Sequence, residues 1–196
     1  DVVYASKAFS SKALFRLLAA EGTGFDVVSG GELYGALKAG VDKEKIYFHG
    51  NNKSDEEICM ALDAGIGYFV VDNIMECDRL VKLSEEKQRP VKALLRIHPG
   101  ISAHTHEYIM TSKPDSKFGI YIENREHIDY VIDKMAAGRY AKLAGFHSHI
   151  GSQIVEAESF EKALGTMIGF LTSSQEDVTW SAAASTSGMA FAIATP

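Results

Sequence analysis

The chain has 196 residues, of which 46% are hydrophobic and 23% are charged, a composition typical of folded globular proteins. This length is enough for one domain with a substantial core, but it is short of the ~250 residues of a complete eight-stranded α/β barrel. The formal net charge of −6, without any basic run, argues against nucleic acid as a partner.

The sequence also indicates in which cellular compartment the protein is expected. No apolar stretch reaches the length of a membrane span, and no charged segment followed by an apolar one marks a leader. The two cysteines, Cys59 and Cys77, are too few for a disulfide scaffold. We therefore expect a cytoplasmic protein with no membrane partner. Because the chain opens directly on Asp1 and a strand, we also expect it to be a fragment of a longer protein.

Strands and helices are predicted to alternate along the chain. Short β-branched or aromatic runs predict strands at 2–4, 25–28, 46–48, 68–71, 91–97 and 143–146. Helical patterns separate them, at about 10–22, 32–40, 54–62, 74–83, 127–135 and 158–171. This alternation is typical of a parallel sheet.

Polar residues stand at the carboxyl ends of these strands. Lys7, Asp26, His49, Asp72 and Arg96 follow one another at a steady interval of 19 to 24 residues, and His147 comes 51 residues after Arg96, beyond the long loop. In a barrel such ends form one ring around a single mouth, whereas an open doubly wound sheet is the alternative. No Gly-x-Gly-x-x-Gly follows the first strand, which disfavours a dinucleotide fold. We predict a partial (β/α)8 barrel of the TIM type over 1–171, with about six βα units.

The end of the chain is left unassigned. Residues 172–196 are rich in Ser, Thr and Ala and show no clear period of two or 3.6. No motif is placed on this segment.

Lys7 is the first candidate for chemistry. A lysine at the carboxyl end of a buried strand is expected to lose hydration, which favours the free amine that forms an imine with a carbonyl. An exposed lysine that simply follows a strand is the alternative.

Other strand ends carry candidates of the same kind. Asp26 precedes the turn Ser29-Gly30-Gly31-Glu32, where a tight βα turn with Glu32 at the helix start is the plain alternative. His49 opens a polar run that ends at Ser54, which suits a ligand rim as well as a turn. A long connection at 97–119 is of a length that is usually functional.

Paired histidines raise a different possibility. His104 and His106 form one His-x-His pair and His147 and His149 another, and such pairs can bind zinc. A metal-dependent barrel hydrolase is therefore an alternative. Arg96 and the lysine at strand ends would repel a cation, so we expect no metal.

The motifs together resemble the fold-type III, alanine-racemase-like family of pyridoxal-phosphate enzymes, and within it the match is close to the diaminopimelate decarboxylases. The residues that carry the resemblance are Tyr4–Ala8, Asp26–Leu33, His49–Ser54, Ala103–Ile109, Asp115–Gly119 and His147–Gln153. It covers about residues 1–160. The segment 104–109 points to these decarboxylases rather than to ornithine or arginine relatives.

The resemblance implies a cofactor and a reaction. Pyridoxal 5'-phosphate would be attached to Lys7, His149 would stack on its ring, and Ser152 would help hold its phosphate. The implied substrate is the small amino acid meso-diaminopimelate, which loses carbon dioxide to give L-lysine. The implied full-length enzyme is a homodimer.

The resemblance also implies a polar shell around the cofactor. Asp26 and Arg96 would lie beside the ring and the lysine, with Glu32 and His49 around them. The Gly-Gly-Gly-Phe-Gly loop, the Glu-Pro-Gly-Arg segment and the C-terminal β domain of the family are missing from the sequence. A non-catalytic pyridoxal-phosphate-binding barrel is therefore an alternative, although the substrate-specific segment 104–108 favours an enzyme.

Overall fold

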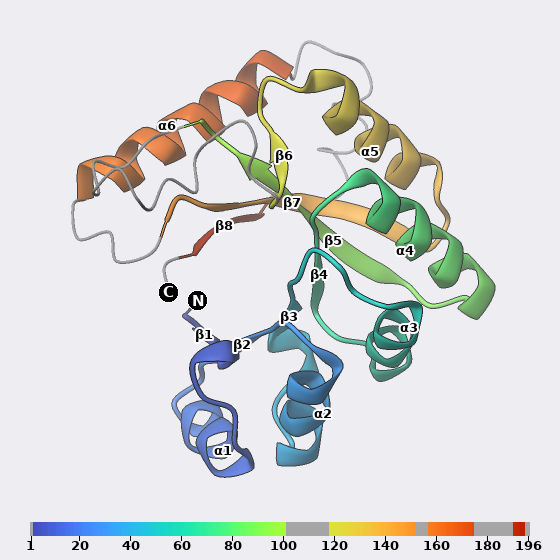
Figure 1. Ribbon diagram of the computed structural model, residues 1–196, viewed down its shortest axis with the longest axis vertical. Coiled ribbons are helices and arrows are strands. Elements are labelled where there is room, and N and C mark those ends of the chain that lie inside the picture. The colour runs from blue at the N-terminus through green and yellow to red at the C-terminus, as the bar shows by residue number, and fades with distance from the viewer. Residues whose placement is uncertain (1, 101–117, 152–156, 175–189, 195–196) are drawn as a thin grey trace.

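The computed structural model describes residues 2–100, 118–151, 157–174 and 190–194. Helices and strands alternate over these ranges as the sequence predicts (Figure 1). The strands are β1 Val3–Ala5, β2 Gly24–Val27, β3 Ile46–Phe48, β4 Tyr68–Val71, β5 Val91–His98, β6 Ile120–Tyr121, β7 Ala141–His149 and β8 Ala190–Ala194. The α-helices are α1 Lys12–Ala20, α2 Gly30–Ala39, α3 Asp55–Ala64, α4 Ile74–Lys87, α5 Arg125–Ala137 and α6 Ala157–Ser174, and the 3₁₀ turns are η1 Ser6–Ala8 and η2 Lys43–Lys45.

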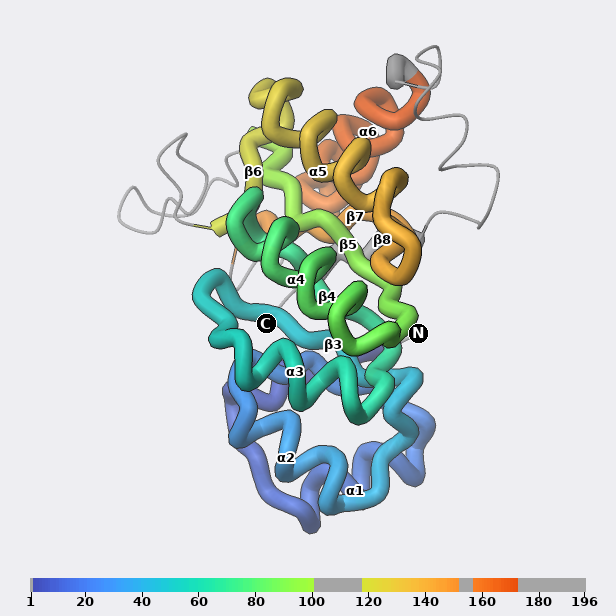
Figure 2. Tube along the Cα trace, turned by 90° about the vertical axis from the view of Figure 1, so that its right-hand side faces the viewer, coloured from blue at the N-terminus to red at the C-terminus, as the bar shows by residue number. Residues whose placement is uncertain are grey.

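The sheet is parallel throughout, and its order follows the chain. The strands run β1-β2-β3-β4-β5-β7-β8, with β6 pairing with β5 beside this path. A doubly wound sheet reverses its strand order at a switch point, and this order contains no reversal. The sheet curves, and its helices lie on the outer side of the curve (Figures 1 and 2). This arrangement confirms the predicted partial barrel.

Local signals explain where the helices begin and end. The side chains of Ser11, Ser29 and Ser54 each accept a hydrogen bond from the backbone N–H three residues on, which satisfies one of the free donors of the first turn. Gly40 and Gly65 end α2 and α3 at φ angles of 80° and 66°, in the left-handed region that glycine adopts without strain.

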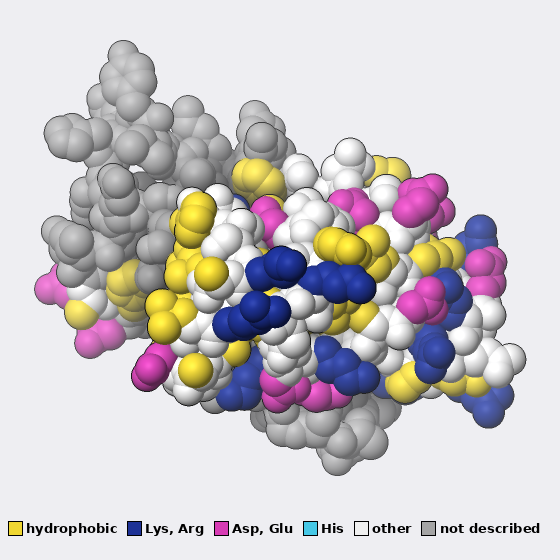
Figure 3. Space-filling model, turned by 90° about the horizontal axis from the view of Figure 1, so that it is seen from below, with side chains coloured by type: hydrophobic (Ala, Val, Ile, Leu, Met, Phe, Trp, Pro, Cys, Tyr) yellow, Lys and Arg dark blue, Asp and Glu magenta, His cyan; other side chains and the backbone are white. Residues whose placement is uncertain are grey.

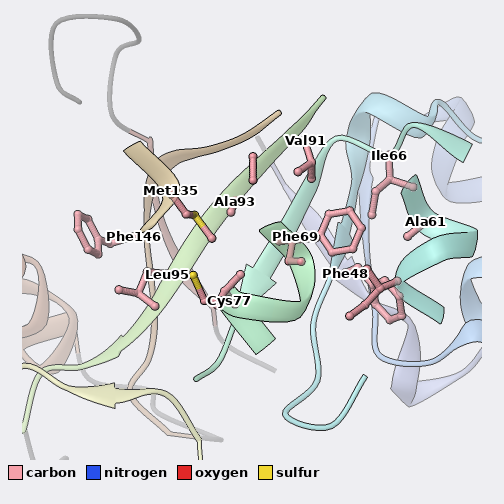
Figure 4. Packing of buried hydrophobic residues seen from close by; sticks show 14 of the residues in the cluster. Phe48, Ala61, Ile66, Phe69, Cys77, Val91, Ala93, Leu95, Met135 and Phe146 are labelled. Atoms are coloured by element: carbon pink, nitrogen blue, oxygen red, sulfur yellow. The ribbon is translucent and has the colours of Figure 1, made fainter. Parts of the chain in front are cut away.

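The core lies between the sheet and the helices. In β2 and β3 the residues alternate, so that Phe25 and Phe48 are buried under the helices while Asp26 and Tyr47 face the other side of the sheet. Further along the sheet, Leu95 and Phe146 continue the same buried layer (Figure 4). This continuous apolar layer fixes the strands whose ends carry the candidate residues.

Two segments differ from the sequence prediction. Helix α6 extends to Ser174, and β8 lies within the tail that the sequence left unassigned. Strand β8 pairs in parallel with β7, and Ala190 is the register partner of Gly145. The expected tail is therefore partly a strand of the sheet, whose pairing a low-complexity sequence does not reveal.

The outer surface carries mixed charges. Seen from below in Figure 3, Lys and Arg side chains lie among Asp, Glu and scattered hydrophobic side chains. Leu17 and Tyr34 are examples of exposed apolar residues, on α1 and α2. Single exposed apolar residues of this kind are normal on soluble proteins. Within the described ranges, no helix is both long and apolar enough to cross a bilayer.

Candidate functional site

The polar residues that end the strands gather at one edge of the sheet. The carboxyl ends of parallel strands meet there, so residues far apart in the sequence become neighbours. The set consists of Lys7 in η1, Asp26 in β2, His49 directly after β3, Asp72 directly after β4, Arg96 in β5, and His147 and His149 in β7.

Lys7 stands in the turn that follows β1. The neighbouring Ser6 is fully buried, and its hydroxyl lies 2.7 Å from the carbonyl oxygen of Asp26 and 2.7 Å from Oε2 of Glu32. This contact fixes the turn to β2. The side chain of Lys7 itself is exposed, so the loss of hydration expected from the sequence is wrong for the part of the chain that the structure describes.

Asp26 and His49 form the next contact in the set. Burial raises the pKa of Asp26 from the usual 3.8 to about 7, while the positive charge of Lys7 opposes the shift. Burial also lowers the pKa of His49 well below its usual value, and the neighbouring His147 adds to this. His49 Nε2 lies 3.8 Å from Asp26 Oδ1, which is too long for a hydrogen bond. The His49 imidazole is therefore neutral, and it does not form an ion pair with Asp26.

His147 and Arg96 continue the set across the sheet. The rings of His49 and His147 meet edge to face with centroids 4.6 Å apart. Burial lowers the pKa of His147 from 6.5 to about 3, and the charge of Arg96 contributes. Arg96 Nη1 lies 3.6 Å from Oδ1 of the buried Asp72, and its guanidinium stacks 4.9 Å from the ring centroid of Phe118.

Several buried polar atoms in this region have no hydrogen-bond partner among the described residues. They are Oδ1 of Asp26 and both ring nitrogens of His147. An unpaired buried polar atom costs about 1–3 kcal/mol, which a polar ligand would offset. Together with the cations of Lys7 and Arg96, these atoms fit an anionic, aromatic cofactor that carries both donors and acceptors, as pyridoxal phosphate does.

The structure brings together most of the residues predicted from the sequence. Lys7, Asp26, His49 and Arg96 lie at one edge, and His149 ends β7 beside them with a partly exposed side chain. Ser152 lies outside the described residues, as do both histidines of the pair in the long loop. Within the described ranges, no three His, Cys, Asp or Glu side chains gather as a metal site would require.

Some contacts were not predicted from the sequence. Asp72 was noted only as a strand-end residue, and His147 as a strand-end residue and part of a His-x-His pair, yet they contact Arg96 and His49 directly. Beneath them lies a buried ion pair in which Lys53 Nζ is 2.6 Å from Glu76 Oε1, with both side chains 1% exposed. A lysine just before a helix cap gives no sequence signal of burial, because two of its partners, Val70 and Glu76, come from the next βα unit.

Comparison with known proteins agrees with this geometry. Residues 1–182 match the family model described as pyridoxal-dependent decarboxylase, pyridoxal binding domain. The chain is 50% identical over 177 residues to a diaminopimelate decarboxylase of Halalkalibacterium halodurans, covering 90% of this chain and 40% of the relative. It is 49% identical over 160 residues to the diaminopimelate decarboxylase of Bacillus subtilis, covering 82% of this chain and 36% of that protein.

Solved structures extend the likeness to the fold. The diaminopimelate decarboxylase of M. jannaschii, crystallised with L-lysine, matches with a TM-score of 0.81 and 36% identity over 90% of this chain and 41% of its own. The Helicobacter pylori enzyme, also complexed with L-lysine, matches with a TM-score of 0.81 and 30% identity, covering 90% of this chain and 44% of its own. The chain thus spans about two fifths of the length of these relatives, and it belongs to the family of pyridoxal-dependent decarboxylases through its pyridoxal-binding domain.

Proposed function

We propose that the chain provides the cofactor-binding barrel of an enzyme that decarboxylates meso-diaminopimelate to L-lysine and carbon dioxide. The observation that carries the proposal is the cluster of Lys7, Asp26, His49 and Arg96 at one edge of the sheet, in a chain 50% identical to a diaminopimelate decarboxylase. L-lysine, the expected product, is the molecule named in two of the similar crystal structures.

Lys7 and Asp26 have the central roles. When bound, pyridoxal phosphate supplies a carbonyl that reacts with amines and a ring that accepts the electron pair of the broken bond. The amine of Lys7 would hold the cofactor through its carbonyl, and the same amine would be able to carry a proton. Asp26, with its pKa near 7, exchanges a proton close to neutral pH and so suits the region beside the ring.

The histidines and Arg96 prepare the surroundings. His49 and His147 stay neutral because they are buried, so their rings pack in the site and offer single donors without adding positive charge. Arg96, held by Asp72, brings a fixed cation to the same edge for a carboxylate or phosphate. We assign His149 to the face of the cofactor ring and Ser152 to its phosphate.

We also propose the setting in which the chain works. The full-length protein would be a cytoplasmic homodimer, with the remaining active-site groups supplied by parts of the protein beyond this barrel. The proposal needs no metal ion and no macromolecular ligand.

Labelling of Lys7 tests the proposal. The chain is mixed with pyridoxal phosphate, reduced with borohydride and digested, and the modified peptide is mapped by mass spectrometry. We expect a phosphopyridoxyl group on Lys7 and loss of visible absorption on reduction, and neither in the Lys7→Ala variant. The exposed Lys12→Ala variant, on the adjacent helix, is the matched control and should label like the unchanged chain.

The outcomes separate the alternatives. Labelling at Lys7, with release of carbon dioxide from diaminopimelate by the full-length protein, supports the decarboxylase. Labelling without any release supports a non-catalytic cofactor-binding barrel. If Lys7 stays unmodified in both the chain and the full-length protein, the proposed function is wrong.

A further inference from the structure

The three helices that follow β2, β3 and β4 begin in the same way. Each has a Ser or Asn at its N-cap and a glutamate at the third helical position. The caps are Ser29, Ser54 and Asn73, and the glutamates are Glu32, Glu57 and Glu76. In each case the cap side chain accepts a hydrogen bond from the backbone N–H of the glutamate.

Each carboxylate first accepts a backbone hydrogen bond within its own βα turn. Oε2 of Glu32 accepts from the backbone N–H of Val28 at 2.9 Å, and Oε2 of Glu57 accepts from that of Ser54 at 2.9 Å. In the same manner Oε2 of Glu76 accepts from the N–H of Asp72 at 3.2 Å. These contacts are the ordinary chemistry of a helix start, and a cap requires nothing more.

Each carboxylate also reaches back to the preceding βα unit. The hydroxyl of Ser6, in the turn after β1, donates to Glu32 at 2.7 Å. The backbone N–H of Gly30, at the start of α2, donates to Oε1 of Glu57 at 2.7 Å. The ammonium of Lys53, before α3, donates to Oε1 of Glu76 at 2.6 Å. Three successive carboxylates thus connect four successive units.

The connected turns are the ones that carry the candidate site. Ser6 precedes Lys7, and its hydroxyl also lies 2.7 Å from the carbonyl oxygen of Asp26. Lys53 donates in addition to the carbonyl of Gly50, the residue after His49, at 2.8 Å. In α5 the corresponding position is His127, whose ring lies 3.0 Å from the Asn124 side chain of its own cap.

We propose that Glu32, Glu57 and Glu76 are positioning residues. They fix where neighbouring strand ends lie relative to one another along the strand direction. These strand ends carry Lys7, Asp26, His49 and Asp72. A carboxylate that accepts hydrogen bonds from two βα units holds the turns of both units at the same position along the strand direction. The charged acceptor makes each bond stronger than a neutral hydrogen bond, and the fixed geometry keeps the side chains of neighbouring units in contact. The consequence for cofactor binding rests on the proposed function.

Glu57 offers the sharpest test, because it is partly exposed and touches none of the candidate site residues. Glu57→Ala removes its bridge together with its bond to the Ser54 N–H, and Glu56→Ala is the control in the same turn, since the exposed Glu56 lies one residue earlier and bonds to Ser54 of the local cap. The variants have the same charge and the same helix propensity.

The glycines on the other side of the bridge give an independent pair. A Cβ on Gly30 would lie 3.1 Å from Cγ of Glu57 and displace its side chain, whereas a Cβ on Gly31 would meet only Ser29 Oγ, at 3.9 Å. Both glycines are helical, so Gly30→Ala and Gly31→Ala gain the same helix propensity and differ in their effect on the bridge.

Two measurements are made on the folded chain, so that differences in stability do not enter. The first is the apparent Kd for pyridoxal phosphate from visible absorption at a pH where all variants are folded. We expect it to rise roughly tenfold in Glu57→Ala and Gly30→Ala, the effect of losing one charge-assisted bond, and to stay within about twofold in the controls. The second is the NMR signal of the His49 ring without cofactor, which should move only in the two bridge variants.

The outcomes decide the proposal in either case. If the bridge variants and their controls behave alike in both measurements, the glutamates are caps and the proposal is wrong. If neither the unchanged chain nor the full-length protein binds pyridoxal phosphate, the proposed function fails, and the His49 signal alone still decides whether Glu57 positions the strand end.

Discussion

The buried pair of Lys53 and Glu76 gives the strongest prediction about stability. The ammonium of Lys53 makes three hydrogen bonds, to the carbonyls of Gly50 and Val70 and to Glu76, and its side chain is 1% exposed. Lys53→Met fills a similar volume but leaves two carbonyls and one buried carboxylate without that donor. Breaking one partner of a buried ion pair costs about 3–5 kcal/mol, a large part of the stability of an ordinary domain.

The pH dependence of this loss has a definite sign. Burial raises the pKa of Glu76 above its usual 4.5, and Lys53 opposes the shift, so the variant raises the folded-state pKa further. A carboxyl whose pKa is raised on folding stabilises most when it is protonated, at low pH. The deficit of Lys53→Met relative to the unchanged chain should therefore be smaller at pH 5 than at pH 8.

Urea unfolding at the two pH values measures both effects. Lys82→Met is the control, because Lys82 belongs to a pair of 3.8 Å with Glu86 in which both side chains are more than half exposed. Its loss should stay within about 0.5 kcal/mol. Adding Glu76→Gln to Lys53→Met should recover part of the loss even where the single variant does not fold. A loss below about 1 kcal/mol for Lys53→Met, or one that is equal at both pH values, would refute the reasoning.

Three further results are expected. Gly67→Ala should destabilise by more than about 3 kcal/mol in urea unfolding, because its Cβ would lie 2.0 Å from the carbonyl oxygen of Glu44, whereas Gly169→Ala, with nothing within 4 Å, should not destabilise. Since folding raises the pKa of Asp26 from 3.8 to about 7, its contribution to stability is present at acidic pH and is lost as the pH rises to 7 and beyond. The unfolding free energy should therefore fall between pH 5 and 8 by roughly 2–3 kcal/mol, and this fall should be absent in Asp26→Asn. The His147 ring, with a pKa of about 3, should show no protonation by NMR between pH 5 and 8; titration in that range would contradict its burial.

The sequence predicted the elements well because the signals for them are local. A short β-branched run, a Ser or Asn cap and a glycine at the helix end each act within a few residues, and the structure uses Ser54 and Gly65 in these roles. The position of Asp26 at a strand end follows from the same local pattern. The fold class required only that these elements alternate.

Properties that depend on several units at once could not be predicted. Lys7 is placed correctly after β1, but its exposure depends on residues that approach it from other strands. Lys53 is buried because acceptors from Gly50, Val70 and Glu76 converge on it. Strand β8 is similar, since its place in the sheet comes from pairing with β7 rather than from its own composition.

The protonation states of the site are also collective. Asp26 alone is an ordinary carboxyl, and His147 alone is an ordinary imidazole. Burial in the sheet makes the Asp26 carboxyl easy to protonate and the His147 imidazole hard to protonate. Arg96 keeps its charge because it is paired with Asp72. Below about pH 7 the site thus holds a protonated Asp26 and a neutral His147 between the cations of Lys7 and Arg96, which attract an anionic ligand. Of the three bridging carboxylates, Glu32 adds to the raised pKa of Asp26, and Glu57 and Glu76 are held in bonds between the units.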